Sequence, residues 1–381
     1  MNSTRIISSD SHIIEPPNLW QERMPKEFGD RIPRLGKGER ENADDFYVEG
    51  QPIGVLFKSH TDAGKRFSNP DEIRLEGEIS EIRPGAWEPE PRLKDMDLDG
   101  VYSDFIYPSV ILHFWSGIQD PILLRGIFAA YNDWLGEFCS AKPERLNGIA
   151  QIALDDDIPA GVKELERVAK RGMAGAMISV GPREGERYDS PEYEQFWTAA
   201  EEIGLPLSLH IGTSRAASGA LGDNRMIKIS ATAALRTNIE FAVRLSLCEL
   251  IYSGVLERHP KLPFIQLEHE LSWVPFFIDR MEWVYRERPQ LTTYRFKNGA
   301  TPTTFMRNQV YHSFLEDGLG IKLRYEIGVD NLMWGSDYPH VESTWPKSQE
   351  ILDDILEGVP EDEKQKIVTG NAARLYGIDL N

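Results

Sequence analysis

Cysteine is scarce in this chain. Only Cys139 and Cys248 occur among 381 residues, and they do not form a C-x-x-C pair. This argues against a disulfide framework or a thiolate metal site and favours the reducing cytoplasm. No apolar run approaches the roughly 20 residues that a membrane span requires, and the N-terminus lacks a charged-then-apolar signal. We therefore expect a cytoplasmic protein with no membrane partner.

Positive charge is also in short supply. Lysine and arginine number 42 against 61 acidic residues, which leaves a net charge of -19. Such a balance argues against nucleic acid or an anionic membrane surface as a partner, although a local basic pocket could still bind a small acid. Neither G-x-G-x-x-G nor G-x-x-x-x-G-K-[ST] follows any expected strand, which counts against a nucleotide-binding sheet. The apolar share of 41% is enough for a sizeable core.

Short apolar runs alternate with helical patterns along most of the chain. The expected strands lie near residues 6–12, 103–108, 146–154, 175–179, 205–210, 262–269, 309–312 and 331–334. Helical spacing is expected near 92–100, 121–141, 158–171, 191–203, 230–252, 272–286, 319–327, 347–356, 361–368 and 371–376. Repeated strand–helix alternation requires parallel strands with helical crossovers. Eight such units predict an α/β fold of the (β/α)8 TIM-barrel type rather than an open doubly wound sheet.

One block departs from this alternation. Residues 18–90 are rich in proline, glycine and charge and show little periodicity. We expect a single barrel domain over residues 1–381, with this block as a loop-rich excursion that serves as a lid or an oligomer contact. A small hairpin is expected within residues 46–57. Surface positions are expected for His60 and Arg66, since nothing in the sequence fixes where these side chains point.

Residues capable of binding a metal stand at the ends of several expected strands. Asp10 and His12 are two apart on the first strand and therefore project to the same side. An isolated D-x-H is more often a solvated aspartate beside a capping or core histidine. However, His210, His269 and Asp337 also follow strands whose carboxyl ends meet at the catalytic face of a barrel. Together they form a nitrogen and oxygen donor set suited to Zn²⁺, or to Mn²⁺ or Fe²⁺.

Four further residues are weaker candidates. His113 follows the second expected strand and His312 ends the seventh, so each either lines the pocket or packs in the core. His340 comes three residues after Asp337 and could orient that loop as an outer partner of a metal ligand. Glu15 precedes two prolines. It could reach a metal or a water, but a turn carboxylate is the simpler interpretation.

Several motifs resemble one known family. They are Asp10-x-His12, Leu207-Ser-Leu-His210-Ile-Gly, Arg258-His-Pro-x-Leu-x-Phe, Trp334-Gly-Ser-Asp337-Tyr-Pro-His340 and Gly370-Asn-Ala-Ala-Arg-Leu-Tyr376. They look like the amidohydrolase-related (amidohydrolase 2) family, in the branch typified by aminocarboxymuconate semialdehyde decarboxylase. The resemblance extends over nearly the whole chain except residues 18–90. It implies a distorted TIM barrel with one divalent metal, usually zinc or manganese, and non-oxidative decarboxylation or hydrolysis.

The resemblance also implies roles for individual residues. The positions that match the family's metal ligands are Asp10, His12, His210 and Asp337. His269 matches the histidine that polarises water or substrate. The family usually has histidine or glutamate at the position of Asp10, which leaves the ligand count and the metal open. Arg215, in the loop after His210, is the best candidate for a substrate-clamping arginine, and a surface arginine is the alternative.

These observations predict an enzyme that binds a small carboxylated organic acid against one divalent ion. The metal would act as a Lewis acid, Asp337 would take or deliver a proton, and His269 would stabilise oxyanion charge. One alternative is a dinuclear iron or manganese oxygenase whose extra ligands come from Glu15, His312 or Glu316. Another is a non-catalytic partner subunit. A homodimer is expected from the family resemblance alone.

Overall fold

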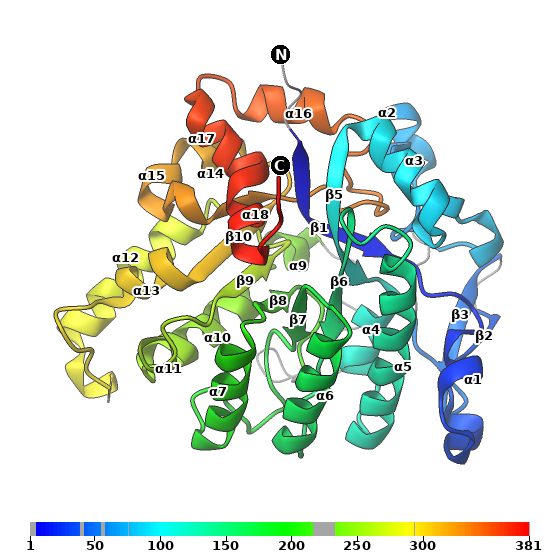
Figure 1. Cartoon of the computed structure of the whole chain (residues 1–381), viewed down its shortest axis with the longest axis horizontal. Coiled ribbons are helices and arrows are strands. Elements are labelled where there is room, and N and C mark those ends of the chain that lie inside the picture. The colour runs from blue at the N-terminus through cyan, green and yellow to red at the C-terminus, as the bar shows by residue number, and fades with distance from the viewer. Residues whose placement is uncertain are drawn as a thin grey trace.

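The computed structural model describes residues 5–38, 42–54, 58–74, 76–215, 233–292 and 294–380. Its central strands are β1 Ile6–Ile13, β5 Val101–Pro108, β6 Leu146–Gln151, β7 Gly175–Ile178, β8 Leu207–His210, β9 Phe264–Leu267, β10 Val310–Phe314 and β11 Leu332–Trp334. They form one sheet of parallel neighbours in the order β1-β5-β6-β7-β8-β9-β10-β11. Figure 1 shows this sheet curling into a barrel with helices outside it. The sequence-based prediction of eight strands in a (β/α)8 fold is confirmed.

The barrel closes where β11 meets β1. The backbone N–H of Asp337 donates to the carbonyl oxygen of Asp10 (3.0 Å), and the Ser9 hydroxyl donates to the carbonyl oxygen of Trp334 (2.9 Å). Gly335 allows this approach, because a Cβ at that position would lie 2.6 Å from the Cβ of Asp10. The first and last strands therefore bring their chemically important residues side by side.

Most expected helices are found. The longer ones are α3 Pro89–Asp99, α4 Val110–Gly117, α5 Pro121–Cys139, α6 Ile158–Lys170, α7 Glu194–Ile203, α10 Phe241–Tyr252, α12 Val274–Glu287, α13 Pro302–Gln309 and α16 Ser348–Ile355. The short ones are α1 Leu19–Arg23, α2 Lys65–Ser68, α9 Ala233–Thr237, α11 Val255–Arg258, α14 Gly318–Lys322, α15 Arg324–Ile327, α17 Glu361–Gln365 and α18 Asn371–Tyr376. Several expectations were wrong in detail. The helix expected over 230–252 is divided into α9 and α10, with 230–232 outside the described residues, and the helix expected over 319–327 is divided into α14 and α15. Helices α4 and α13 were not expected.

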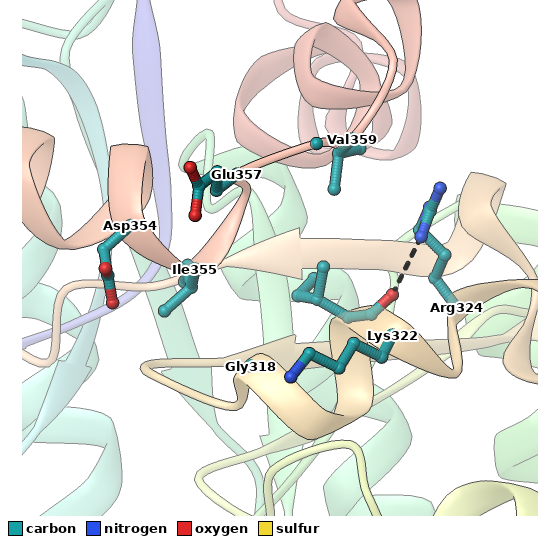
Figure 2. A pocket seen from close by; sticks show the side chains of 9 residues that line it. Gly318, Lys322, Arg324, Asp354, Ile355, Glu357 and Val359 are labelled. Atoms are coloured by element: carbon teal, nitrogen blue, oxygen red, sulfur yellow. Dashed lines mark hydrogen bonds between the residues drawn. The ribbon is translucent and has the colours of Figure 1, made fainter.

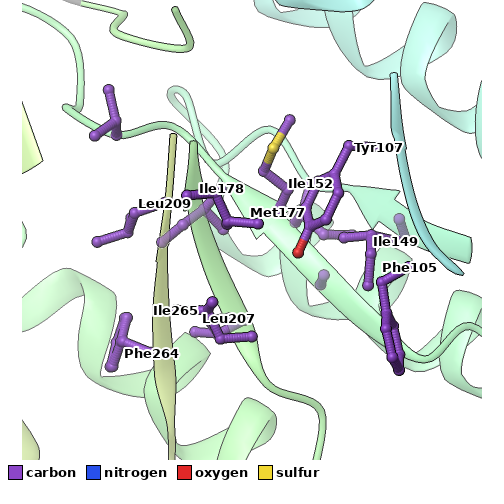
Figure 3. Close-up of a cluster of buried hydrophobic side chains, with 14 of the residues drawn as sticks. Phe105, Tyr107, Ile149, Ile152, Met177, Ile178, Leu207, Leu209, Phe264 and Ile265 are labelled. Carbon is purple, nitrogen blue, oxygen red and sulfur yellow. The ribbon is translucent and has the colours of Figure 1, made fainter. Parts of the chain in front are cut away.

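The core is built from both faces of the barrel strands. Figure 3 shows apolar side chains from neighbouring strands packed together, including Phe105, Ile149, Met177 and Leu209. Each of these side chains is fully buried. Full burial of an aliphatic side chain of this size contributes about 1.5–3 kcal/mol. This packing fixes the strands, and so fixes the residues at their carboxyl ends.

The excursion has two parts. Its first part forms a small antiparallel sheet from β2 Arg34–Lys37, β3 Asp44–Val48 and β4 Gln51–Pro52, so the expected hairpin exists but gains a strand. The last residues of that expectation, 55–57, lie outside the described chain. Beside this sheet, Trp20 of α1 donates from its indole N–H to the Ile127 carbonyl of α5 (3.2 Å) (Figure 1).

The second part of the excursion returns to the end of the barrel. The N–H of Val341 donates to Ser59 (2.8 Å), and that of Ala63 to Pro339 (3.1 Å). This part therefore lies against the loop that follows β11. Separately, none of the helices in the described ranges is long and apolar enough to cross a bilayer.

Candidate metal centre

Three of the expected metal-binding residues meet at the carboxyl ends of β1 and β8. The Nε2 atom of His12 lies 3.2 Å from that of His210 and 3.5 Å from Oδ1 of Asp10. All three side chains are fully buried. The register of β1 shifts against β5 between Ser8 and Ser11, and such a bulge next to a functional site re-aims side chains.

Asp337 reaches the same place from the loop after β11. Its Oδ1 lies 3.5 Å from His12 Nε2, and its backbone is left-handed (φ 55°). His340 Nδ1 lies 2.7 Å from the same carboxylate oxygen. The His340 ring stacks on that of His12, and its Nε2 is 3.0 Å from the Ser109 hydroxyl. His340 therefore contacts two of the expected ligands at once.

Glu268 is the residue that sequence reasoning missed. It follows β9 directly, and its Oε1 lies 3.0 Å from His12 Nε2 and 3.5 Å from His210 Nε2. The expected residue at this strand end was its neighbour His269. Strand alternation would point the two side chains to opposite sides, but Glu268 has a left-handed backbone (φ 59°), so alternation fails there. The only sequence signal was an acidic residue beside the expected histidine.

His269 is held beside the cluster by Gln266. Its Nδ1 lies 3.1 Å from Gln266 Oε1, while the Gln266 amide nitrogen donates to the Glu270 carbonyl (3.0 Å). That amide orientation makes His269 Nδ1 the protonated nitrogen and leaves the lone pair on Nε2. Nε2 is buried and has no hydrogen-bond partner among the described residues. Burial lowers the pKa of His269 to about 3, so the ring is neutral.

The hydrogen bonds of His12 and His210 show why a cation fits. Each donates from Nδ1 to a backbone carbonyl, His12 to Pro108 and His210 to Ile211, both at 2.8 Å. A carbonyl can only accept, so each neutral ring carries its lone pair on Nε2. The two lone pairs therefore face each other at 3.2 Å. This arrangement is repulsive unless a proton or a cation lies between the rings.

The carboxylates lead to the same conclusion. Within the described ranges, the buried carboxylate oxygens of Asp10 and of Asp337 accept no hydrogen bond of regular geometry, although His340 Nδ1 lies 2.7 Å from Asp337 Oδ1. Donor atoms lie within 4.8 Å of one another in two overlapping groups, Asp10, His12, His210 and Glu268, and His12, Glu268, Asp337 and His340. Ligands bound at about 2.0–2.2 Å sit roughly 3.0–3.5 Å apart, which agrees with the shorter separations given above. The residues fit a divalent metal ion.

The pKa values of the clustered side chains are shifted in the direction that a bound cation would reverse. Burial, and then the nearby Glu268 carboxylate, raises the pKa of Asp10 to about 8. The same two causes raise the pKa of Asp337 well above its usual value. Burial alone would lower the pKa of His12, but its hydrogen bond to Glu268 and the nearby carboxylates raise it. A bound cation would favour the charged carboxylates and the neutral ring.

Two other candidates are engaged in structural contacts. The carboxylate of Glu15 accepts hydrogen bonds from the backbone N–H groups of Val110 (2.9 Å) and Ile111 (3.0 Å), at the start of α4. Arg215 is buried, and its guanidinium donates to Asp155 (2.7 Å) and to the Ile118 carbonyl (2.7 Å). The structure therefore places neither side chain in the cluster.

His113 and His60 lie at the edge of the cluster. His113 is on α4, not in a loop as expected, and its Nε2 is 2.8 Å from His60 Nε2. His60 Nδ1 in turn lies 3.3 Å from His340 Nε2. The expectation of a surface position for His60 was wrong, because the excursion carries this half-buried residue to the barrel end.

His312 is buried in the middle of β10, not at the end of the strand as expected, with Nδ1 3.4 Å from Gln266 Nε2. Burial lowers its pKa from 6.5 to about 3. Between these values the unfolded chain binds the proton and the folded chain does not, so this residue makes stability fall as the pH drops below 6.5. We expect His312→Gln to reduce the stability lost between pH 6.5 and pH 5 by roughly 2 kcal/mol in urea unfolding. An unchanged pH dependence would contradict this assignment.

A separate cavity of about 270 Å³ lies between α14, α15 and the end of α16. Figure 2 shows its lining, which includes Lys322, Arg324, Asp354 and Glu357. Arg324 donates to the Ile321 carbonyl (3.2 Å) and to Glu363 (2.6 Å). Its lining residues are different from those of the cluster, so the cavity is not part of this candidate site.

A barrel with buried metal-binding side chains at the carboxyl ends of its strands defines the class of metal-dependent barrel enzymes. The family model described as amidohydrolase matches residues 60–378, and the chain belongs to this family. It is therefore a metal-dependent enzyme, a hydrolase or a carboxy-lyase, as the sequence predicted. Glu15 and Glu316, which the dinuclear alternative would recruit, instead bond the start of α4 and Arg66. The dinuclear and non-catalytic alternatives are not favoured.

Named relatives agree with this family. The chain is 24% identical over 307 residues to 2-amino-3-carboxymuconate-6-semialdehyde decarboxylase of Dictyostelium discoideum, covering 79% of this chain and 80% of that protein. It is 26% identical over 309 residues to gamma-resorcylate decarboxylase of Rhizobium sp. (strain MTP-10005), covering 76% and 86%. The crystal structure of an amidohydrolase from Mycobacterium avium subsp. paratuberculosis K-10 superimposes with a TM-score of 0.78 at 21% identity, over 99% and 100% of the chains.

Proposed function

We propose that this enzyme catalyses the non-oxidative decarboxylation of a small aromatic or enolic carboxylic acid. The observation that carries the proposal is the convergence of buried carboxylates and imidazole lone pairs at the barrel end. Two relatives of this chain are named as decarboxylases of small unsaturated acids, which favours decarboxylation over hydrolysis. We assign Asp10, His12, His210 and Asp337 as metal ligands on the basis of their mutual distances.

A divalent ion bound by these residues would act as a Lewis acid for substrate oxygens. In the reaction, the bond between the substrate carbon and its carboxylate breaks, carbon dioxide leaves, and the carbon takes a proton. We propose that Asp337 takes a proton from solvent before the site closes over the substrate and delivers it to this carbon, which returns Asp337 to its charged form. The Nε2 lone pair of His269 accepts a proton from a substrate hydroxyl, and the resulting imidazolium then donates a hydrogen bond to the oxyanion. Deep burial excludes bulk water from both steps.

Isotope incorporation distinguishes the two reaction types. The metal-loaded enzyme is incubated with a panel of hydroxybenzoic and enolic acids in D₂O, and then in H₂¹⁸O. Decarboxylation releases carbon dioxide and places one deuterium on the carbon that carried the carboxylate. Hydrolysis instead places ¹⁸O in an organic product. A product that retains its carboxylate and carries ¹⁸O would overturn the proposal.

Three finer features also belong to this proposal. Two imidazoles and two carboxylates suit zinc, with manganese or iron as alternatives. A homodimer is supported by exposed apolar side chains on α10 and α12, of which Phe241 is 52%, Leu245 53% and Phe276 61% exposed. Light scattering of the purified protein, which gives its mass in solution, tests whether it is a homodimer. The free thiols of Cys139 and Cys248 support a reducing, cytoplasmic setting.

We further propose that the second part of the excursion, residues 58–68, is a lid over the site. Arg66 supports this, since it donates to the Ser343 carbonyl (3.0 Å) and pairs with Glu316. His60→Ala removes the contacts with His113 and His340, and we expect kcat/KM to fall about tenfold. Arg74→Ala is the control, because Arg74 lies in the same excursion with 60% of its side chain exposed. Equal effects of the two changes would contradict the lid.

A further inference from the structure

Two glutamates with the same unusual backbone flank His269. Glu268 (φ 59°) and Glu270 (φ 55°) are both left-handed. This conformation costs a residue with a side chain roughly 1–2 kcal/mol, and such strain concentrates at functional sites. The two side chains have different surroundings. The Glu270 carboxylate accepts a hydrogen bond from the Leu315 N–H (3.3 Å), whereas Glu268 Oε1 lies against His12 and His210.

The hydrogen bond between His12 Nε2 and Glu268 Oε1 (3.0 Å) requires a doubly protonated His12, because Nδ1 of that ring already donates to a carbonyl. Glu268 Oε1 lies 3.0 Å from the Nε2 atom of His12 and 3.5 Å from that of His210. Both rings donate from Nδ1 to backbone carbonyls, so both Nε2 atoms carry lone pairs when the rings are neutral. Three acceptor atoms therefore converge on one point. A cation at that point would turn this repulsion into attraction.

Glu268 also occupies a distinct place in the cluster. It belongs to both groups of donors that lie within 4.8 Å of one another, a property it shares only with His12 among the described residues. Its side chain is 14% exposed, against 0% for Asp10 and 1% for Asp337. It is therefore the carboxylate on the open side of the cluster, where substrate would enter.

We infer that Glu268 is a fifth protein ligand of the metal. The donor set then consists of two imidazoles and three carboxylates instead of two and two. Carboxylate-rich sets suit Mn²⁺ better than nitrogen-rich sets do. Glu268 thus lowers the ratio of Zn²⁺ affinity to Mn²⁺ affinity at this site. The inference rests on the proposed metal centre and adds a residue that neither the family motifs nor the strand-end pattern contained.

Binding measurements on metal-free protein test this role. Mn²⁺ and Zn²⁺ affinities are determined by calorimetric titration for the wild type, Glu268→Gln and Glu270→Gln. The Glu270 variant is the matched control, since it replaces a carboxyl group by an amide in the same backbone conformation one residue beyond His269. We expect Glu268→Gln to lose ten- to a hundredfold in Mn²⁺ affinity and less in Zn²⁺ affinity. The control should stay within about threefold of the wild type for both ions.

A glycine variant separates ligation from folding. Glycine adopts the left-handed backbone without strain, so metal-free Glu268→Gly should unfold at the same or a higher temperature than the wild type. Its Mn²⁺ affinity should nevertheless fall as in Glu268→Gln. A lower unfolding temperature in metal-free Glu268→Gly, with Mn²⁺ affinity retained, would show a structural role and overturn the inference.

The metal centre and the Glu268 ligand can be refuted separately. A wild-type chain that takes up neither Mn²⁺ nor Zn²⁺ would refute the proposed metal centre itself. A wild type that binds one ion, with Glu268→Gln indistinguishable from Glu270→Gln, would refute the Glu268 ligand alone. Equal losses for both ions in Glu268→Gln would overturn the selectivity role.

Discussion

His12→Ala is expected to leave the protein without its metal and without activity. His12 is the residue around which the cluster is arranged, because its Nε2 lies within 3.5 Å of Asp10, His210, Glu268 and Asp337. Loss of an outer partner of a ligand costs 10–100-fold in metal affinity. Loss of the central ligand should cost more, so we expect a decrease of more than about 100-fold. Turnover should then fall to background.

Elemental analysis of the purified protein checks this expectation directly. The wild type should carry close to one divalent ion per chain, and His12→Ala almost none. His259→Gln is a suitable control, because His259 lies away from the cluster, near Glu194 (3.0 Å) and Glu201 (3.3 Å). His12→Ala that retains a full equivalent of metal and normal turnover would remove the basis of the proposed function.

The barrel could be predicted because local signals repeat along the chain. Most strands are short apolar runs bounded by glycine, proline or a polar residue, and most are followed by a helical pattern. The Asp10-x-His12 pair could be read as a unit, since alternation on a strand fixes both side chains on one side. The closure of β11 on β1 then follows from the fold class and not from any local pattern.

The parts of the fold and of the site that the sequence did not predict depend on backbone turns or on contacts between distant residues. Helix α4 begins with the apolar run Val110-Ile-Leu, which has no helical period, so it could be read as a loop or a core segment. Glu268 points into the cluster because its backbone leaves the strand conformation. His60 contacts a residue 280 positions away, and composition alone gave its loop no fixed place.

Arg92 is expected to be the residue outside the cluster whose loss is most damaging to stability. Its guanidinium is fully buried and bonds Asp104 through Nε (3.0 Å) and Nη2 (2.8 Å). It also donates to the Ser11 hydroxyl and to the backbone carbonyl of His12 (2.5 Å). Arg92→Met would leave the Asp104 carboxylate buried and unpaired. We expect a loss of roughly 3–5 kcal/mol in the free energy of unfolding, measured by urea denaturation.

The double variant Arg92→Met/Asp104→Leu tests the cause of that loss. Replacing both members of a buried pair by apolar residues removes the unpaired charge, so most of the stability should return. Both variants should bind the metal less tightly than the wild type does. In both, the carbonyl of His12 lacks the Arg92 donor that fixes its backbone. If the double variant were as unstable as Arg92→Met, the lost packing of the arginine side chain would be responsible instead of the charge. Recovery of stability without recovery of metal affinity would show that this buried pair both supports β1 and sets the position of His12.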